Sequence, residues 1–149
     1  MKKKIVLATD HAGFELKEEI KKYLVESGME VEDMGAYTLD PKDDYPDFII
    51  PAAKKVAEEQ SKGIIFGASG QGEAIAANKI KGIRAALYYG KDIKIVKLSR
   101  THNDTNILSL GAKFLAKDEA IKAVNVWLKT DFSNEERHIR RIKKISDPK

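Results

Sequence analysis

Short apolar runs alternate with amphipathic stretches along this chain. The run at 4–9 consists mostly of aliphatic residues, as in a buried strand, whereas at 14–25 apolar side chains recur every three or four residues, as on one face of a helix. The same alternation continues through the rest of the chain. It predicts strands at 4–9, 29–34, 63–66, 84–88 and 107–110, and helices at 14–25, 48–60, 73–79, 91–98, 118–128 and 134–145.

Strands separated by helices indicate one parallel sheet, because a parallel neighbour is reached only through a long crossover. The sequence therefore predicts an α/β protein with helices on both faces of a five-stranded parallel sheet, followed by an extra C-terminal helix. The polar segment 36–47, with prolines at 41 and 46, is expected to be a loop. Since no repeat, linker or low-complexity segment interrupts the pattern, we expect residues 1–149 to form a single domain.

Composition and charge narrow the classes of function. The 149 residues include no cysteine, which excludes disulfides, iron–sulfur clusters, thiolate metal sites and cysteine nucleophiles. The net charge of +4 comes from 137–149, which holds six Lys and Arg residues and one acid, leaving 21 bases and 22 acids elsewhere. No stacking aromatics or nucleic-acid-reading motif accompany this basic segment, so we expect no nucleic-acid partner; a solvated helix end and a small-anion site remain as explanations.

No apolar run is long enough for a membrane span and the first residues do not resemble a signal peptide, so we expect a cytoplasmic protein with no membrane contact.

Candidate chemistry lies where predicted strands end, since ligands of parallel sheets bind beyond the carboxyl ends of the strands. Asp10 and His11 follow the first strand. They could form an acid–base or anion-binding pair, or Asp10 could simply cap the helix that follows. The third strand leads into 67–73, Gly-Ala-Ser-Gly-Gln-Gly-Glu, which lacks the lysine of a P-loop and the glycine spacing of a dinucleotide loop. Its glycines allow backbone N–H groups to converge on an oxyanion, while Glu73 alone is explained by the preference of acids for a helix start.

Two other polar groups stand out. The segment 100–106 is wholly polar, and His102 within it is equally well explained as a surface residue or as a proton donor. Arg137 and Arg141 lie one helical turn apart and are suited to bind one dianion, although such residues usually belong to a solvated helix face. Three separated histidines without cysteine supply no metal-ligand spacing, so no metal site is expected.

Several stretches occur together, in this order, in one known family. They are Asp10-His11-Ala12-Gly13, Asp44-Tyr45-Pro46-Asp47, Gly70-Gln71-Gly72 with Ile75-Ala76-Ala77-Asn78-Lys79, Gly82-Ile83-Arg84-Ala85, His102-Asn103-Asp104-Thr105-Asn106, and Arg137-His138 with Arg141. Through them the chain resembles the type B ribose-5-phosphate isomerases, the family that also holds galactose-6-phosphate isomerase subunits. The resemblance spans nearly the whole chain. It implies a Rossmann-like three-layer α/β/α sandwich that forms a homodimer, or a higher oligomer, with active sites shared between two subunits.

The resemblance also implies an activity, the interconversion of D-ribose 5-phosphate and D-ribulose 5-phosphate through an enediolate without a metal or organic cofactor. By position, Glu73 would be the base that moves the carbon-bound proton, and Ser69 would shuttle hydroxyl protons. Asp10 and His102 would handle ring opening. The backbone N–H groups offered to the enediolate would come from the loop of Ser69, Gly70, Gln71, Gly72, Glu73 and Ala74.

The remaining residues carried over by position would bind the substrate. Tyr45 and Asn103 would line the sugar site. The phosphate would be held by His11, Arg137 and Arg141, with the arginines reaching in from the partner subunit.

Two departures from the family pattern affect this assignment. Some members place a cysteine base where this chain has Gly67, whereas Glu73 matches the subgroup with a glutamate base. Lys113 stands where many relatives are expected to have arginine, and its ammonium lacks the fork of a guanidinium. The alternatives are isomerisation of galactose 6-phosphate or allose 6-phosphate, and a non-catalytic sugar-phosphate or nucleotide-binding module. Glu73, His102 and Asp10 together argue against the module, because binding alone needs no base.

Overall fold

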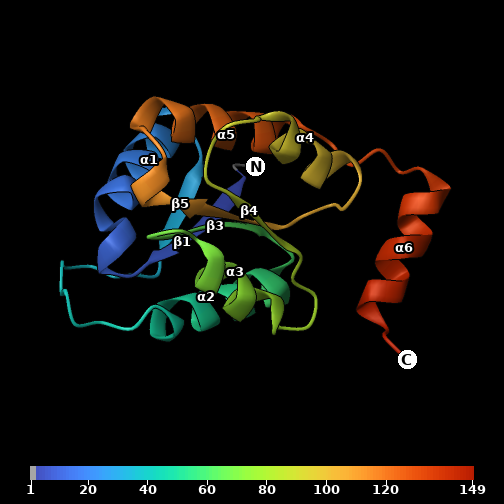
Figure 1. Ribbon diagram of the computed structural model, residues 1–149, viewed down its shortest axis with the longest axis horizontal. Helices are drawn as coiled ribbons and strands as arrows, with labels where there is room; N and C mark the ends of the chain where they lie inside the picture. Colours follow the sequence, from blue (N-terminus) through green and yellow to red (C-terminus); the bar gives the residue numbers. More distant parts are fainter. Residues whose placement is uncertain (1–2) are drawn as a thin grey trace.

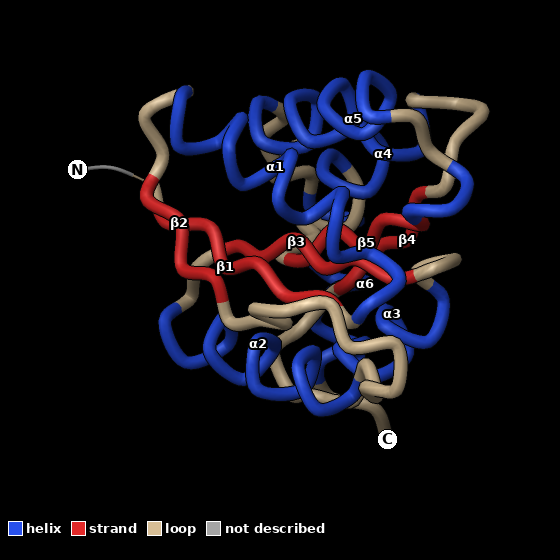
Figure 2. The backbone as a smooth tube through the Cα atoms, turned by 90° about the vertical axis from the view of Figure 1, so that its left-hand side faces the viewer, coloured by secondary structure: helices blue, strands red, loops and turns tan. Residues whose placement is uncertain are grey.

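The computed structural model describes residues 3–149 and confirms the predicted α/β fold. One parallel sheet has the strand order β2-β1-β3-β5-β4, and helices cover both of its faces to give three layers (Figure 1, Figure 2). The strands are β1 (Lys4–Thr9), β2 (Glu30–Asp33), β3 (Lys62–Gly67), β4 (Ala85–Tyr88) and β5 (Ile107–Gly111). The helices are α1 (Phe14–Glu26), α2 (Pro46–Glu59), α3 (Gln71–Asn78), α4 (Lys94–Thr101), α5 (Lys117–Lys129) and α6 (Glu136–Ser146), with short 3-10 turns η1 (His11–Gly13) and η2 (Ala112–Phe114).

The core consists of two apolar clusters, one on each side of the sheet. On one side α1, α4 and α5 pack against the strands through residues such as Leu24, Val96 and Trp127. On the other side α2 and α3 contribute residues such as Ile49 and Ala77. Because the central strands β1, β3 and β5 are covered on both faces, they are apolar runs rather than alternating ones.

The strand ends meet in register at one edge of the sheet. Thr9 pairs with Phe66, and Gly67 pairs with Gly111, so the segments that follow β1, β3 and β5 emerge side by side. Strand order also reverses here, since the chain leaves β1 toward β2 but β3 lies on the other side of β1. At Gly13 a Cβ atom would lie 2.5 Å from the Phe66 Cβ, so glycine lets η1 sit directly against β3.

The segment that follows α4 lies at the opposite edge. Helix α4 carries the chain back from the end of β4 to the start of β5, where Ile107 pairs with Gly63 near the start of β3. Six residues of strand span about 20 Å. Residues 102–106 therefore lie at the amino edge of the sheet, away from Asp10 at the carboxyl edge.

Helix α6 stands to one side of the three layers (Figure 1). An extended segment leads to it from α5, and the Ser133 N–H donates to the Thr101 carbonyl, 3.2 Å away, at the end of α4. Ile139 and Ile145 of α6 are 36% and 59% exposed. The helix is amphipathic and leaves part of its apolar face uncovered.

Some boundaries differ from those predicted by the pattern. Helix α2 begins at Pro46 instead of 48, so Pro46, which was expected in the preceding loop, occupies the first turn of the helix. Helix α4 begins at Lys94 instead of 91, because Gly90 and Lys91 both have positive φ (112° and 80°) and Asp92 accepts the Lys94 N–H at 3.0 Å. Among residues 3–149, no helix is long and apolar enough to span a bilayer.

Candidate active site

Asp10 follows β1 and has two roles in the structure. Its Oδ1 accepts the Ala12 N–H at 2.9 Å and so caps η1. Its Oδ2 lies 3.9 Å from Nδ1 of His11. The residue is only 6% exposed. Capping and proximity to the histidine thus coexist, and the capping interaction fixes the carboxylate beside the ring.

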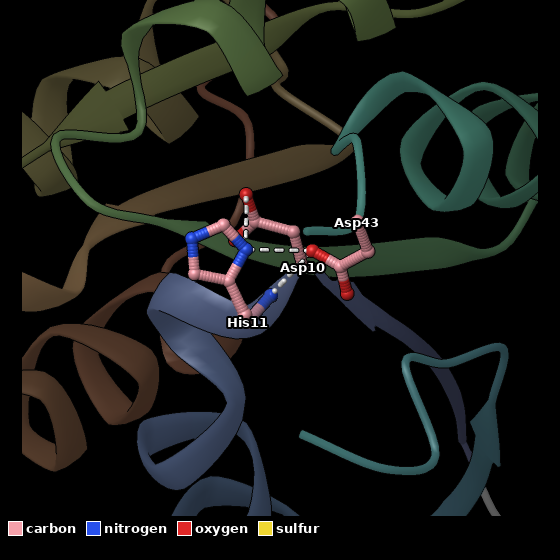
Figure 3. A group of neighbouring side chains, drawn as sticks. All are labelled: Asp10, His11 and Asp43. Atoms are coloured by element: carbon pink, nitrogen blue, oxygen red, sulfur yellow. Dashed lines mark hydrogen bonds and ion pairs between the residues drawn. The ribbon is translucent and has the colours of Figure 1, made fainter. Parts of the chain in front are cut away.

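His11 is bound by an acid that the sequence analysis did not single out. Oδ1 of Asp43, in the loop before α2, accepts the His11 backbone N–H at 3.0 Å and lies 2.7 Å from Nδ1 of the ring (Figure 3). The pKa of His11 is raised, chiefly by this hydrogen bond and also by the charges of Asp10 and Asp43, while partial burial and Lys113 oppose the rise. Lys113 lies in η2, which packs against η1.

Glu73 lies in the first turn of α3, and its side chain reaches back to the end of β3. A Cβ atom on residue 67 would overlap the Glu73 carboxylate, so Gly67 leaves the space that this carboxylate fills. Glu73 is 5% exposed. Burial raises its pKa, as does repulsion from Asp10, although a hydrogen bond from its own backbone N–H opposes the rise. The two carboxylates are therefore electrostatically coupled neighbours.

The glycine loop between β3 and α3 is held from two sides. Gly70 has a φ of +81°, which glycine adopts without strain, and its carbonyl accepts the Ser109 hydroxyl of β5 at 2.7 Å. Ser69 Oγ accepts the Gln71 N–H at 3.3 Å. Tyr45 lies across the loop, since a Cβ atom on Gly72 would come within 2.5 Å of its hydroxyl. The loop thus joins Tyr45 and Glu73 in one group at the helix N-terminus.

A second group lies on α6 and the loop after α4. The rings of His102 and His138 stack with centroids 4.2 Å apart and planes 18° apart. His138 is 5% exposed, and burial lowers its pKa, with His102, Arg137 and Arg141 adding to the effect. The ring stack therefore joins the predicted residue His102 to the helix that carries both predicted arginines.

The arginines themselves are free to reach outward. Arg137 and Arg141 are exposed, and Arg137 lies 3.5 Å from a Glu135 carboxylate oxygen. Within residues 3–149 no ion pair involves Arg141. Asn103 is exposed as well. Three of the predicted substrate-binding residues thus form an open polar surface in the isolated chain.

Buried hydrogen bonds hold the loop that carries His102. Arg100, 5% exposed, donates from Nε to the Thr130 carbonyl at 3.0 Å and from Nη1 to Asp104 Oδ1 at 2.9 Å. The Trp127 indole N–H donates to the Thr105 hydroxyl at 2.9 Å. The sequence analysis did not assign a role to Arg100 or Trp127, and their contacts fix the loop against the end of α5.

The structure therefore divides the predicted site residues into two groups at opposite edges of the sheet. We call them the carboxyl-edge cluster and the α6 cluster. The carboxyl-edge cluster consists of Asp10, His11, Tyr45, Ser69, Gly70, Gln71, Gly72, Glu73 and Ala74, and the α6 cluster consists of His102, Asn103, Arg137 and Arg141. Asp10 and His102, which the sequence analysis placed in one step of the reaction, are not brought together within one chain.

Comparisons with known proteins agree with the resemblance seen in the sequence. The model of the Ribose/Galactose Isomerase family matches residues 5–145. Ribose-5-phosphate isomerase B from Mycolicibacterium paratuberculosis is 42% identical over 140 residues, which cover 93% of this chain and 87% of that relative.

Solved structures give the same result. Ribose-5-phosphate isomerase B from Clostridium thermocellum superposes with a TM-score of 0.91 at 40% identity, covering 97% of this chain and 95% of that one. The Mycoplasma genitalium ribose-5-phosphate isomerase B with bound ribulose-5-phosphate superposes with a TM-score of 0.93 at 39% identity, covering 98% and 95%. Sequence, fold and comparisons agree, and the chain belongs to the ribose/galactose isomerase family.

Proposed function

We propose that this protein is an aldose–ketose isomerase that interconverts D-ribose 5-phosphate and D-ribulose 5-phosphate through an enediolate. The observation that carries the proposal is the buried Glu73 carboxylate, which fills the space over Gly67 beside a loop of backbone N–H groups. Relatives named ribose-5-phosphate isomerase B, one of them with bound ribulose-5-phosphate, support the choice of substrate.

Glu73 is the base of the proposed reaction. Its carboxylate takes the proton from C2 of the open-chain aldose, and the C–H electrons form the C1–C2 double bond while O1 becomes the oxyanion. The resulting carboxylic acid then returns the proton to C1 to give the ketose. A buried carboxyl with a raised pKa suits both halves of this transfer, because it is a stronger base than an exposed glutamate.

The glycine loop stabilises the charge that develops on the sugar oxygens. The N–H groups of the first turn of α3 carry the positive end of the helix dipole, and those of Gln71 and Glu73, bound here to Ser69 Oγ and the Glu73 carboxylate, would turn to the substrate. Gly70 and Gly72 allow the substrate to approach these groups closely. Ser69 moves the hydroxyl proton from O2 to O1, so every proton removed in the first half is replaced in the second.

Ring opening requires groups from both clusters, and we propose that two chains supply them. Asp10 of one chain and His102 of the partner subunit act on the ring oxygen and the anomeric hydroxyl. In a two-fold symmetric dimer each carboxyl-edge cluster meets the α6 cluster of the other chain, so two equivalent sites form. The exposed apolar side of α6, with Ile139 and Ile145, supplies contact area for such a dimer.

The substrate is held at its two ends. Tyr45 lies at the sugar, and Asn103 of the partner subunit completes that side. The phosphate is bound by His11 together with Arg137 and Arg141 of the partner subunit. Lys113, near His11, adds a point charge where a guanidinium would add a fork.

The proposal includes a single cytoplasmic domain over 1–149 that needs neither a metal nor an organic cofactor. Isomerisation moves protons between adjacent positions, and no electron leaves the substrate. The residues named above supply a base, a hydroxyl shuttle and oxyanion donors. No nucleic-acid partner is part of the proposal.

A second substrate class deserves a direct comparison, because the matching family includes galactose isomerases by its description. The test is a turnover assay with ribose 5-phosphate, galactose 6-phosphate and allose 6-phosphate, each in excess EDTA. We expect the highest kcat/KM with ribose 5-phosphate. A higher kcat/KM with a six-carbon sugar would identify that sugar as the substrate instead. Loss of activity in EDTA would contradict metal independence. Saturable binding without turnover would favour the non-catalytic module.

A further inference from the structure

Asp43 is an acid with a largely buried side chain, and its two carboxylate oxygens lie in different surroundings. Oδ1 accepts the His11 backbone N–H and lies 2.7 Å from the ring Nδ1 (Figure 3). Oδ2 is buried and has no hydrogen-bond partner within the described chain. The side chain is 9% exposed. A carboxylate in such a place is costly unless a positive charge lies against it.

His11 is the group that can supply this charge. Among residues 3–149 it is the one basic side chain within ion-pairing distance of Asp43. A separation of 2.7 Å is typical of a hydrogen bond between an imidazolium and a carboxylate. Figure 3 also shows the second ring nitrogen, Nε2, turned away from both Asp10 and Asp43. One nitrogen is therefore occupied and the other is open.

We propose that Asp43 is a positioning residue that holds His11 as an imidazolium, with Nδ1–H bound to Asp43 and Nε2–H presented to the phosphate of the substrate. This inference rests on the proposed function, in which His11 binds that phosphate. Asp43 itself does not touch the substrate. It fixes the orientation and the proton count of the group that does.

The charges around His11 explain why such a partner is needed. Asp43 and Asp10 raise the pKa of His11, whereas partial burial and Lys113 lower it. In the proposed dimer the two guanidiniums from the partner subunit would lower it further. Without Asp43 the imidazole would sit among three cations with Asp10 alone to balance them, and its proton would be lost at a lower pH.

The same groups balance the charge of the substrate. Asp10, Asp43, Lys113 and a protonated His11 sum to zero, so the partner's two guanidiniums bring the groups at the phosphate to a formal charge of +2, not counting Glu73 at the reacting carbons. That value matches a phosphate dianion. If His11 lost its proton, the site would fall to +1 and Nε2 would become an acceptor facing a phosphate oxygen.

A bound cation is a less suitable explanation for this cluster. Asp10, His11 and Asp43 each offer a ligand atom, all within 4.8 Å of one another. The Nδ1–Oδ1 separation, however, is that of a hydrogen bond. The ammonium of Lys113 nearby also disfavours a cation. A shared proton fits both facts.

The first test measures His11 directly in the substrate-free protein. The Cε1–H resonances of the three histidines are followed by NMR from pH 5 to 9, and His11→Gln identifies the His11 signal. We expect His11 to titrate above ordinary imidazole in the wild type, and Asp43→Asn to move its midpoint down toward or below that of ordinary imidazole. Asp44→Asn, a matched change at the neighbouring exposed acid, should leave it in place. An unshifted midpoint in Asp43→Asn, or a wild-type midpoint at or below ordinary imidazole, overturns the proposal.

The second test measures the consequence for binding. In Asp43→Asn we expect KM for ribose 5-phosphate to rise about 5- to 20-fold at pH 8 and much less at pH 6, with kcat changed less than about twofold. Asp43→Glu, which retains the charge, should recover part of the loss. In a His11→Gln background, Asp43→Asn should have little further effect. An equal rise at both pH values would contradict the role in protonation.

The two tests separate this inference from the proposed function. If the wild type does not turn over ribose 5-phosphate, the proposed function fails, while the NMR titration still decides whether Asp43 controls His11. Inorganic phosphate then serves as the binding probe. It should shift the His11 resonance in the wild type and less in Asp43→Asn at pH 8; equal shifts in the two proteins would overturn the inference.

Discussion

The carboxyl-edge cluster and the α6 cluster are built in opposite ways. In the first, Asp10 and Glu73 are 6% and 5% exposed, and hydrogen bonds from three separate segments hold the neighbouring groups. In the second, a ring stack between His102 and His138 joins two elements, and the arginines beside it are exposed. Carboxylates dominate one cluster and cations the other.

In the proposed mechanism the two clusters have different roles, proton transfer in the first and phosphate binding in the second. Groups that move protons need fixed geometry and a low-dielectric surrounding, and the carboxyl-edge cluster has both. Groups that bind a phosphate need charge and reach, which exposed arginines supply. On this proposal neither cluster alone holds all the required groups, so we expect substitutions in the first to lower kcat and substitutions in the second to raise KM.

The largest effect is expected from Glu73→Gln, which keeps the shape of the side chain and removes the base. We expect kcat to fall about 10²- to 10⁴-fold with KM changed little. The measurement is steady-state turnover of ribose 5-phosphate together with exchange of the carbon-bound proton into D₂O. Near-normal turnover with continued exchange would exclude Glu73 as the base and direct attention to Asp10.

Mixing inactive variants tests whether the clusters of two chains form one site. Glu73→Gln and the double variant Arg137→Ala/Arg141→Ala each carry one damaged cluster. After subunit exchange at equal concentrations, about a quarter of all sites should be intact, because half of the dimers are mixed and each has one good site. Activity at low substrate should recover to about that fraction of the wild type. An active monomer by size-exclusion chromatography would contradict the shared site.

Substitution of the two arginines is expected to affect substrate binding more than the chemical step. For Arg137→Ala and for Arg141→Ala we expect KM to rise about 10- to 150-fold, the value of one lost charge-assisted contact, with a smaller change in kcat. Arg140→Ala, which removes an exposed guanidinium paired with Glu136 on the same helix, is the matched control. Unchanged KM in both test variants would show that the α6 cluster does not bind the phosphate.

The smallest effect concerns stability. The pKa of Glu73 is raised in the folded protein, so the folded state binds its proton more tightly than the unfolded state does. Ionised Glu73 therefore destabilises the fold above the unfolded pKa, and the penalty disappears at lower pH. Glu73→Gln should raise Tm at pH 7, by about 2–4 °C for each kcal/mol relieved, and should have no such effect near pH 4. An equal Tm for both proteins at pH 7 would contradict the raised pKa of Glu73 in the folded protein.

Much of the fold was predictable because the sheet imposes a simple pattern. Central strands buried on both faces must be apolar, and their ends were predicted to within one residue. Helix starts were less accurate where local backbone geometry decides, as at Lys91 with its positive φ. The Asp92 side chain caps the start of this helix, and an aspartate at such a position is a sequence signal that hydrophobic periodicity alone does not take into account.

Candidate site residues could be proposed from the sequence, but their arrangement in space could not. The position of His102 follows from topology, since any segment that leads into a parallel strand lies at the amino edge. The role of Asp43 does not follow from sequence, because Asp40, Asp43, Asp44 and Asp47 share one loop and only its path decides which acid reaches His11. The overlap between residue 67 and Glu73 likewise depends on the turn of the glycine loop.

That overlap constrains how the family could have exchanged one base for another. A cysteine at position 67 and a glutamate at position 73 need the same space, so a chain that acquires the cysteine first must displace the glutamate carboxylate from its place over residue 67. In the proposed mechanism, a chain that loses the glutamate first has no base. Under the proposed mechanism we expect each single step to lower activity although both end points are functional, which would be sign epistasis between two residues six positions apart. We therefore expect the family's two subgroups to be connected through paired changes at these positions, or through a duplicated copy free of selection.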